Sequence, residues 1–128
     1  YLLGLENARY LERDPLQGNL FENLVLTEVL KIFWSQGKNA PLYFFRDNIG
    51  NEVDLIIERG RRVMAVEIKA GQTVNSDWFK GLDYLKKVMG KSVLSRMLIY
   101  GGNENQERTS FNIVSWRDIG YQVGRLIK

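Results

Sequence analysis

The longest periodic segment of the chain runs from Asn19 to Gln36. Its apolar residues recur at intervals of three and four, which is the spacing of one face of an α-helix. They are Leu20, Phe21, Leu24, Val25, Val29, Ile32 and Phe33, and Leu26, Leu30 and Trp34 widen the arc. Gly37 is a natural stop, because glycine adopts the left-handed conformation that often ends helices. The pattern predicts a helix so apolar that the rest of the domain covers it on two sides.

An alternation with a period of two replaces the helical pattern after Gly37. Three segments rich in β-forming residues, Leu42–Arg46, Glu52–Glu58 and Arg62–Lys69, are separated by the turn sequences DNIGN and ERG. We expect three sequential antiparallel strands, a β-meander.

The remainder predicts one helix and two further strands. Asn75 or Ser76 can cap a helix from Asp77 to about Met89, with Gly90 behind it. Trp78, Leu82, Leu85 and Met89 would face inward. SRMLIYGG and FNIVSW are typical of strands, and residues 118–128 are expected to form a short helix or an irregular docking segment. The predicted class is α/β (α+β), with helices flanking a mixed central sheet in the order α-β-β-β-α-β-β.

The first residues differ from this pattern. Residues 1–17 contain a leucine-rich stretch that stops at Asp14-Pro15, where a proline disfavours continuing a helix. We expect residues 1–17 to be an N-terminal arm or linker and residues 18–128 to be one domain, a size that one hydrophobic core can serve.

Composition restricts the chemistry. The chain has neither cysteine nor histidine, which excludes thiolate sites, imidazole bases and the usual zinc sites. Any metal must be held by oxygen, which favours Mg²⁺, Mn²⁺ or Ca²⁺. The net charge of +3 is compatible with a polyanionic partner. No apolar run reaches membrane-spanning length and no signal peptide is visible, so we expect a cytoplasmic domain with no membrane partner.

Three charged residues interrupt the apolar strands. Asp54 lies in the second predicted strand, on the face of Glu52, Ile56 and Glu58; Glu67 and Lys69 lie on one face of the third. A simple antiparallel register brings Asp54 and Glu67 together near one end of the hairpin, although the sequence does not fix that register.

Two adjacent carboxylates repel each other unless a cation lies between them. A divalent ion would resolve the conflict, with the carbonyl of Ile68 as a further oxygen ligand. Lys69 could then orient a water molecule or stabilise a charged transition state. A carboxylate from the first helix, Glu22 or Glu28, would complete the site. The alternative is a solvent-facing row of cross-strand ion pairs, and the short spacing D…ExK alone favours that simpler interpretation.

A wider set of motifs changes this balance. A carboxylate on a helix, an aspartate on a hairpin strand and ExK on the next strand resemble the PD-(D/E)xK phosphodiesterase superfamily. More narrowly, GNLFENLVLTEVLK, LYFFRDNIGNEVDLII and AVEIKAG are similar to a C-terminal domain that follows AAA-type ATPase modules in many bacterial and archaeal proteins. The stretches YLLGL and DPLQGNLFEN also resemble that family, so the resemblance covers nearly the whole chain.

The resemblance implies roles for particular residues. Glu22 corresponds to the helix carboxylate, Asp54 and Glu67 to the metal ligands, and Lys69 to the catalytic lysine. Arg46 and Glu28 also match family positions, but Arg46 could simply pair with a nearby carboxylate and Glu28 could be structural. Val53 stands where the superfamily name has proline, and no residue clearly matches the glutamine that RecB-like members carry on the following helix.

Three functions follow as expectations. The first is a Mg²⁺- or Mn²⁺-dependent nuclease, acting on DNA, attached to an upstream AAA-type ATPase. The second is an inactive module of the same fold that binds nucleic acid or a partner protein for that ATPase. The third is a structural role in ATPase assembly, for which exposed aromatics would be needed; Trp34, Trp78 and Trp116 are expected to be core or semi-core residues instead. No ATP site is expected in this chain, because Gly90-Lys91-Ser92 lacks the first P-loop glycine, and Leu85 holds its place.

Overall fold

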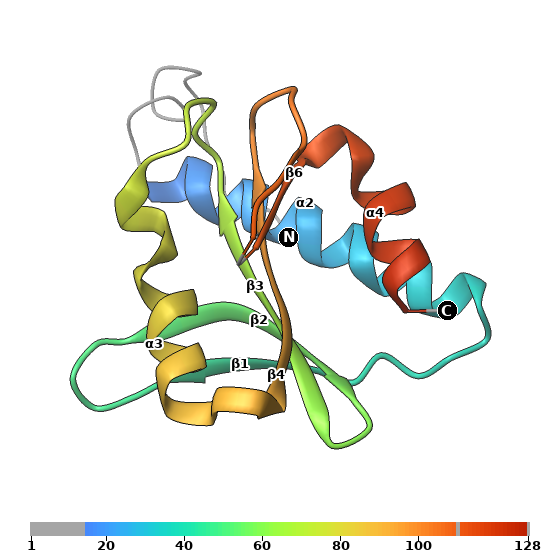
Figure 1. Cartoon of the computed structure of the whole chain (residues 1–128). Coiled ribbons are helices and arrows are strands. Elements are labelled where there is room, and N and C mark those ends of the chain that lie inside the picture. Colours follow the sequence, from blue (N-terminus) through green and yellow to red (C-terminus); the bar gives the residue numbers. More distant parts are fainter. Residues whose placement is uncertain (1–14, 110, 128) are drawn as a thin grey trace.

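The chain is described by a computed structural model for residues 15–109 and 111–127. Within these residues, three α-helices and a six-stranded mixed sheet form an α+β fold (Figure 1). The elements are α2 (Pro15–Ser35), β1 (Leu42–Arg46), β2 (Glu52–Arg59), β3 (Arg62–Lys69), α3 (Lys80–Met89), β4 (Val93–Tyr100), β5 (Gln106–Glu107), β6 (Asn112–Ser115) and α4 (Ile119–Leu126). Short 3₁₀ helices at Ser76–Phe79, Gly90–Ser92 and Trp116–Asp118 precede or follow them.

The strands lie in the order β1-β2-β3-β4-β6-β5. The β1–β2 and β2–β3 pairs are antiparallel, as expected of a meander. The chain then crosses through α3 and returns as β4, which is parallel to β3, and β6 is parallel to β4. The expected mixed sheet and flanking helices are therefore confirmed. The strand β5 was not predicted, and α4 is the short helix considered for residues 118–128.

Two apolar layers hold the helices against opposite faces of the sheet. One layer joins Val29 and Phe33 of α2 and Val123 of α4 to the sheet face that carries Val66 and Ile99. The other places α3 on the opposite face; its members include Ala65, Leu82, Leu85, Leu98 and Ile113. Figure 1 shows α2 and α4 together on one side and α3 on the other.

The helix α2 is longer at its start than predicted. It begins at Pro15, whose fixed φ and missing N–H suit the first helical position. The arm expected over residues 1–17 therefore contributes its last three residues to the helix, and residues 1–14 lie outside the described part. At the other end Gly37 has a φ of 68°, and the Lys38 N–H donates to the Phe33 carbonyl at 3.0 Å, which confirms the predicted stop.

Some inward-facing residues were predicted wrongly. Trp34 is 62 % exposed and Met89 is 37 % exposed, although both were expected in the interior. Trp34 follows the buried Phe33 in the last turn of α2 and points away from the covered face, and Met89 is the last residue of α3. Helical period alone does not reveal where a covered face ends.

The alternation of β2 is broken near its start. Val53 packs in the same apolar layer as Ile56, on the α3 side, whereas Leu55 packs on the α2 side. The pairing of β1 with β2 shifts by one residue between Tyr43 and Phe45, so β2 carries an extra residue there. The predicted common face for Glu52, Asp54, Ile56 and Glu58 is therefore wrong. The predicted faces of β3 are confirmed, since Val63 and Ala65 share one layer and Met64, Val66 and Ile68 the other.

Candidate functional site

The strands β2 and β3 separate at the point where the charged residues lie. Their ladder runs from Arg59 opposite Arg62 to Leu55 opposite Val66 and goes no further. Beyond it, the Ile68 N–H donates to the Asp54 carboxylate at 2.8 Å, so a side chain takes the place of the next backbone partner. The extra residue of β2 lies at this same point and directs Asp54 toward β3. The fork between the strands is therefore closed by a carboxylate.

The carboxyl group of Glu67 meets Asp54 at this fork. Glu67 is only 5 % exposed, and the two side chains are hydrogen-bonded to each other. Burial, together with the hydrogen bond and the charge of Asp54, raises the pKa of Glu67 to about 10, although Lys69 opposes the shift. Two carboxylates cannot share this position without a positive charge between them, and the raised pKa means that Glu67 keeps its proton at neutral pH when no cation is bound. The expected meeting of Asp54 with Glu67 is thus observed, and the solvent-facing row is wrong for Glu67.

Glu22 belongs to α2 and therefore lies on the sheet face opposite to α3. It is half-buried on α2, and its pKa is raised by burial and then by the charges of Asp54 and Glu52, with Lys69 acting in the opposite direction. In residues 15–109 and 111–127, however, no three acidic side chains come together as a group that could hold a metal ion. Of the three carboxylates expected to meet, Asp54 and Glu67 are in contact, and Glu22 lies near Asp54 without joining them.

Oxygen donors beside the pair suit a small divalent ion. In a β-strand the N–H and C=O of one residue point to the same edge, and the Ile68 N–H points at Asp54. The Lys69 carbonyl accepts from Gly101 on the opposite edge, so the Ile68 carbonyl faces the fork. Two carboxylates and a carbonyl are hard ligands, and Mg²⁺ is commonly held by one or two carboxylates while it keeps several waters. Asp54, Glu67 and Ile68 therefore fit such an ion.

Two of the predicted accessory residues lie outside this cluster. Glu28 is half-buried and pairs with Lys31 one turn along α2 at 3.4 Å. Arg46 pairs with Glu52 across the β1–β2 hairpin at 3.1 Å, and both side chains are largely exposed. The structural role considered for each residue is the one observed, and Glu22 is the helix carboxylate that reaches the site.

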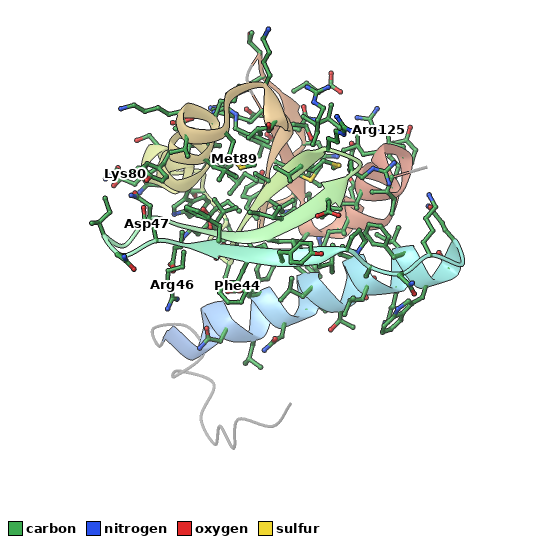
Figure 2. All side chains as sticks on the ribbon, turned by 90° about the horizontal axis from the view of Figure 1, so that it is seen from below. Phe44, Arg46, Asp47, Lys80, Met89 and Arg125 are labelled. Atoms are coloured by element: carbon green, nitrogen blue, oxygen red, sulfur yellow. The ribbon has the colours of Figure 1, made fainter. Side chains whose placement is uncertain are left out.

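The structure also links the turn after β1 to α3, which the sequence pattern did not indicate. The turn after β1 is organised by Asp47, which accepts from the Asn51 side chain at 2.9 Å and from the Tyr84 hydroxyl of α3. The bonds with Asn51 and Tyr84 lower the pKa of Asp47. Figure 2 shows Asp47 on the side of Lys80, while Phe44 and Arg46 point from β1 toward the side of α2. The turn signal DNIGN was visible in the sequence, but its link to α3 was not.

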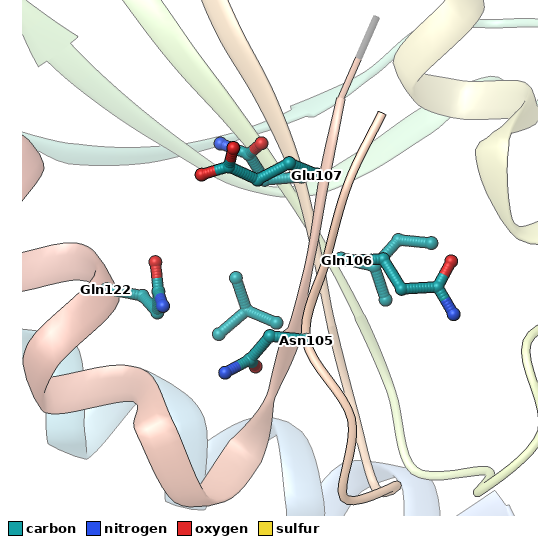
Figure 3. A pocket seen from close by; sticks show the side chains of 7 residues that line it. Asn105, Gln106, Glu107 and Gln122 are labelled. Carbon is teal, nitrogen blue, oxygen red and sulfur yellow. The ribbon is translucent and has the colours of Figure 1, made fainter. Parts of the chain in front are cut away.

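Two of the surface hollows differ in where they lie relative to the acid pair. One of about 370 Å³ lies beside Asp54, between α2 and β1, and is lined by Leu26, Leu30, Ala40, Leu42, Tyr43, Phe44 and Leu55. Another of about 120 Å³ lies between β5, β6 and α4, where Asn105, Gln106, Glu107 and Gln122 surround it (Figure 3). The strand β5 is three strands away from β3 in the sheet, so this second hollow is separate from the acid pair.

Comparison with known protein families gives one match. The profile of a family described as a domain of unknown function, DUF4143, matches residues 17–119. The chain belongs to this family. The matched range includes Glu22, Asp54, Glu67 and Lys69, so the site lies inside the family domain. The folded unit extends further, because Val123 and Ile127 of the C-terminal segment are fully buried against α2 and the sheet. A search among curated proteins finds no match. Within the described residues, none of the helices has both the length and the apolarity to cross a bilayer.

Proposed function

We propose that this domain is a divalent-metal-dependent nuclease of the restriction-endonuclease-like type, which hydrolyses phosphodiester bonds in DNA. The supporting observation is the hydrogen-bonded pair of the half-buried Asp54 and the buried Glu67 at the fork of β2 and β3, with the Ile68 carbonyl and Lys69 beside it. The proposal is also supported by the mixed sheet, in which an antiparallel β1-β2-β3 meander is followed by α3 and the parallel strand β4.

Each residue has a distinct task in this proposal. Asp54 and Glu67 hold Mg²⁺ or Mn²⁺ through carboxylate oxygens, and the ion supplies Lewis-acid stabilisation of phosphoryl oxygens. Glu67 would release its proton to solvent in order to hold the ion. The Lys69 ammonium would orient the attacking water or stabilise charge on the phosphoryl group. Glu22 lies within electrostatic reach of Asp54 and Lys69 and would add negative charge beside a bound cation.

The second candidate is a catalytically inactive module of the same fold that binds nucleic acid or a partner protein. It is favoured by one observation, the lack of a third acidic side chain grouped with the pair in the described residues. In both cases we propose that the module serves an AAA-type ATPase in the parent protein, which the resemblance implies.

The experiment that tests the first candidate is cleavage of supercoiled plasmid DNA by the whole chain. Cleavage is expected with Mg²⁺ or Mn²⁺ and not with EDTA. Asp54→Asn and Lys69→Met should each reduce the rate by about 100-fold or more, since one loses a ligand charge and the other the ammonium group.

Glu58→Gln is the matched control. Glu58 lies on the same strand as Asp54 but is exposed and sits opposite Val63 in the paired part of the ladder, away from the fork, so its variant should cleave at the wild-type rate. Cleavage that survives in Asp54→Asn would refute the nuclease proposal. Absence of cleavage in the wild type, together with DNA binding that weakens with salt, would favour the inactive module.

A further inference from the structure

The first turn of α3 lies unusually close to the acid pair. Gly81 is the second residue of this helix, and a Cβ placed on it would lie 2.1 Å from the Glu52 carbonyl oxygen and 3.1 Å from Oε2 of Glu67. Real Cβ atoms do not approach backbone oxygen so closely. The helix therefore reaches the sheet only because residue 81 has no side chain.

The helix cannot easily shift to make room. Leu82 and Leu85 are buried in the layer between α3 and the sheet, at 0 % and 1 % exposure, and Phe79 just before the helix is 5 % exposed. Moving α3 outward would open that layer. A larger residue at position 81 would instead press on the start of β2 and on the Glu67 carboxyl.

Backbone conformation does not explain the glycine. Gly81 is not among the glycines with positive φ, which are Gly37, Gly50, Gly60 and Gly90. A glycine inside a helix costs about 1 kcal/mol relative to alanine. Without the close contact, alanine would be the more stable residue here.

We propose that Gly81 is a positioning residue for the acid pair, allowing α3 to fix both the backbone at Glu52, two residues before Asp54, and the carboxyl group of Glu67. The inference rests on the proposed function where it concerns metal binding. The effect of Gly81 on the positions of Asp54 and Glu67 does not depend on that function.

The test compares Gly81→Ala with Gly120→Ala in the whole chain. Gly120 is also helical, in α4, but a Cβ there would meet nothing within 4 Å, so the same chemical change is made in open space. Mn²⁺ affinity is measured by calorimetry, and the Ile68 amide signal by NMR without metal. Gly81→Ala should weaken Mn²⁺ binding by about 10- to 100-fold, the usual effect of losing a residue that orients a ligand. It should also move the Ile68 amide signal, because that amide donates to Asp54. Gly120→Ala should change neither.

The outcomes separate the two proposals. If Gly81→Ala binds Mn²⁺ like the wild type and its Ile68 signal is unchanged, the positioning role is overturned. If the wild type binds no Mn²⁺, the metal proposal fails, and the Ile68 signal in metal-free protein still decides the role of Gly81. Should Gly81→Ala be unfolded in buffer, the same measurements are made in trimethylamine N-oxide, which favours the compact state.

Discussion

Replacing Glu67 by glutamine should make the protein more stable at neutral and alkaline pH. Glutamine has the same shape as the protonated glutamic acid, and its amide N–H can donate to Asp54 as that acid does. It carries no ionisable group. The variant therefore keeps the buried hydrogen bond and removes the need to bury a carboxylate or retain a proton.

The size of the effect follows from the pKa of Glu67, which is about 10 in the folded chain against 4.5 ordinarily. Below pH 4.5 the group is protonated in both states and affects stability little. Between these two values the unfolded chain releases the proton and the folded chain keeps it. The free energy of unfolding then falls as pH rises, by up to about 1.4 kcal/mol per pH unit. From pH 6 to pH 8 the wild type should lose up to about 3 kcal/mol from this group, a large part of the roughly 5–15 kcal/mol that stabilises most domains.

The assay is urea unfolding of wild type, Glu67→Gln and the exposed control Glu58→Gln at several pH values from 5 to 8. The wild type and the control should lose stability with rising pH, and Glu67→Gln should show a much flatter dependence. Parallel curves for Glu67→Gln and the wild type would refute the reasoning, because they would mean that Glu67 ionises when folded much as it does when unfolded.

Three further outcomes are expected. Mn²⁺ binding at pH 7 should release about one proton, because the ion replaces the proton shared by Asp54 and Glu67. Calorimetry in two buffers of different ionisation enthalpy measures this release, and equal binding heats in the two buffers would contradict it. Phe33→Ala should lower the free energy of unfolding by about 3–5 kcal/mol, because the ring is 1 % exposed between α2 and the sheet; a loss below 1 kcal/mol in urea unfolding would be incompatible with that burial. Ser115→Ala should cost about 1–3 kcal/mol in the same assay, because its buried hydroxyl donates to the Gly102 carbonyl at 2.6 Å, and an unchanged midpoint would argue against that bond.

Local chemistry made much of the fold predictable. The strands β1 and β3 have the predicted bounds, because runs of β-branched and aromatic residues end at turn sequences with glycine. Gly60, in the turn between β2 and β3, has a φ of 65°, as a tight hairpin requires. Asn75 caps the turn before α3 by accepting from the Asp77 N–H at 2.8 Å. Each of these signals lies within a few residues of the structure it specifies.

Features that depend on distant contacts were not predictable in the same way. The extra residue in β2 is defined only by its pairing with β1, so the alternation rule placed Val53 on the wrong face. The strand β5 has two residues and exists because it pairs with β6. The choice between Glu22 and Glu28 depends on how α2 crosses the sheet. Gly81 carried no signal at all, since its importance comes from the backbone of Glu52, nearly thirty residues earlier in the chain.

The energetic cost of the acid pair is itself an argument for function. Asp54 alone could accept the Ile68 N–H, and an apolar residue in place of Glu67 would suit the layer formed by Ala65 and Leu82. Placing a second carboxyl there costs stability over most of the physiological pH range. The folded chain would be more stable without the Glu67 carboxyl, so this group is better explained by a ligand than by packing. The proposed divalent ion would supply this ligand, because it carries positive charge and is small enough to lie between two carboxylates and a carbonyl, whereas an apolar or anionic molecule meets neither condition.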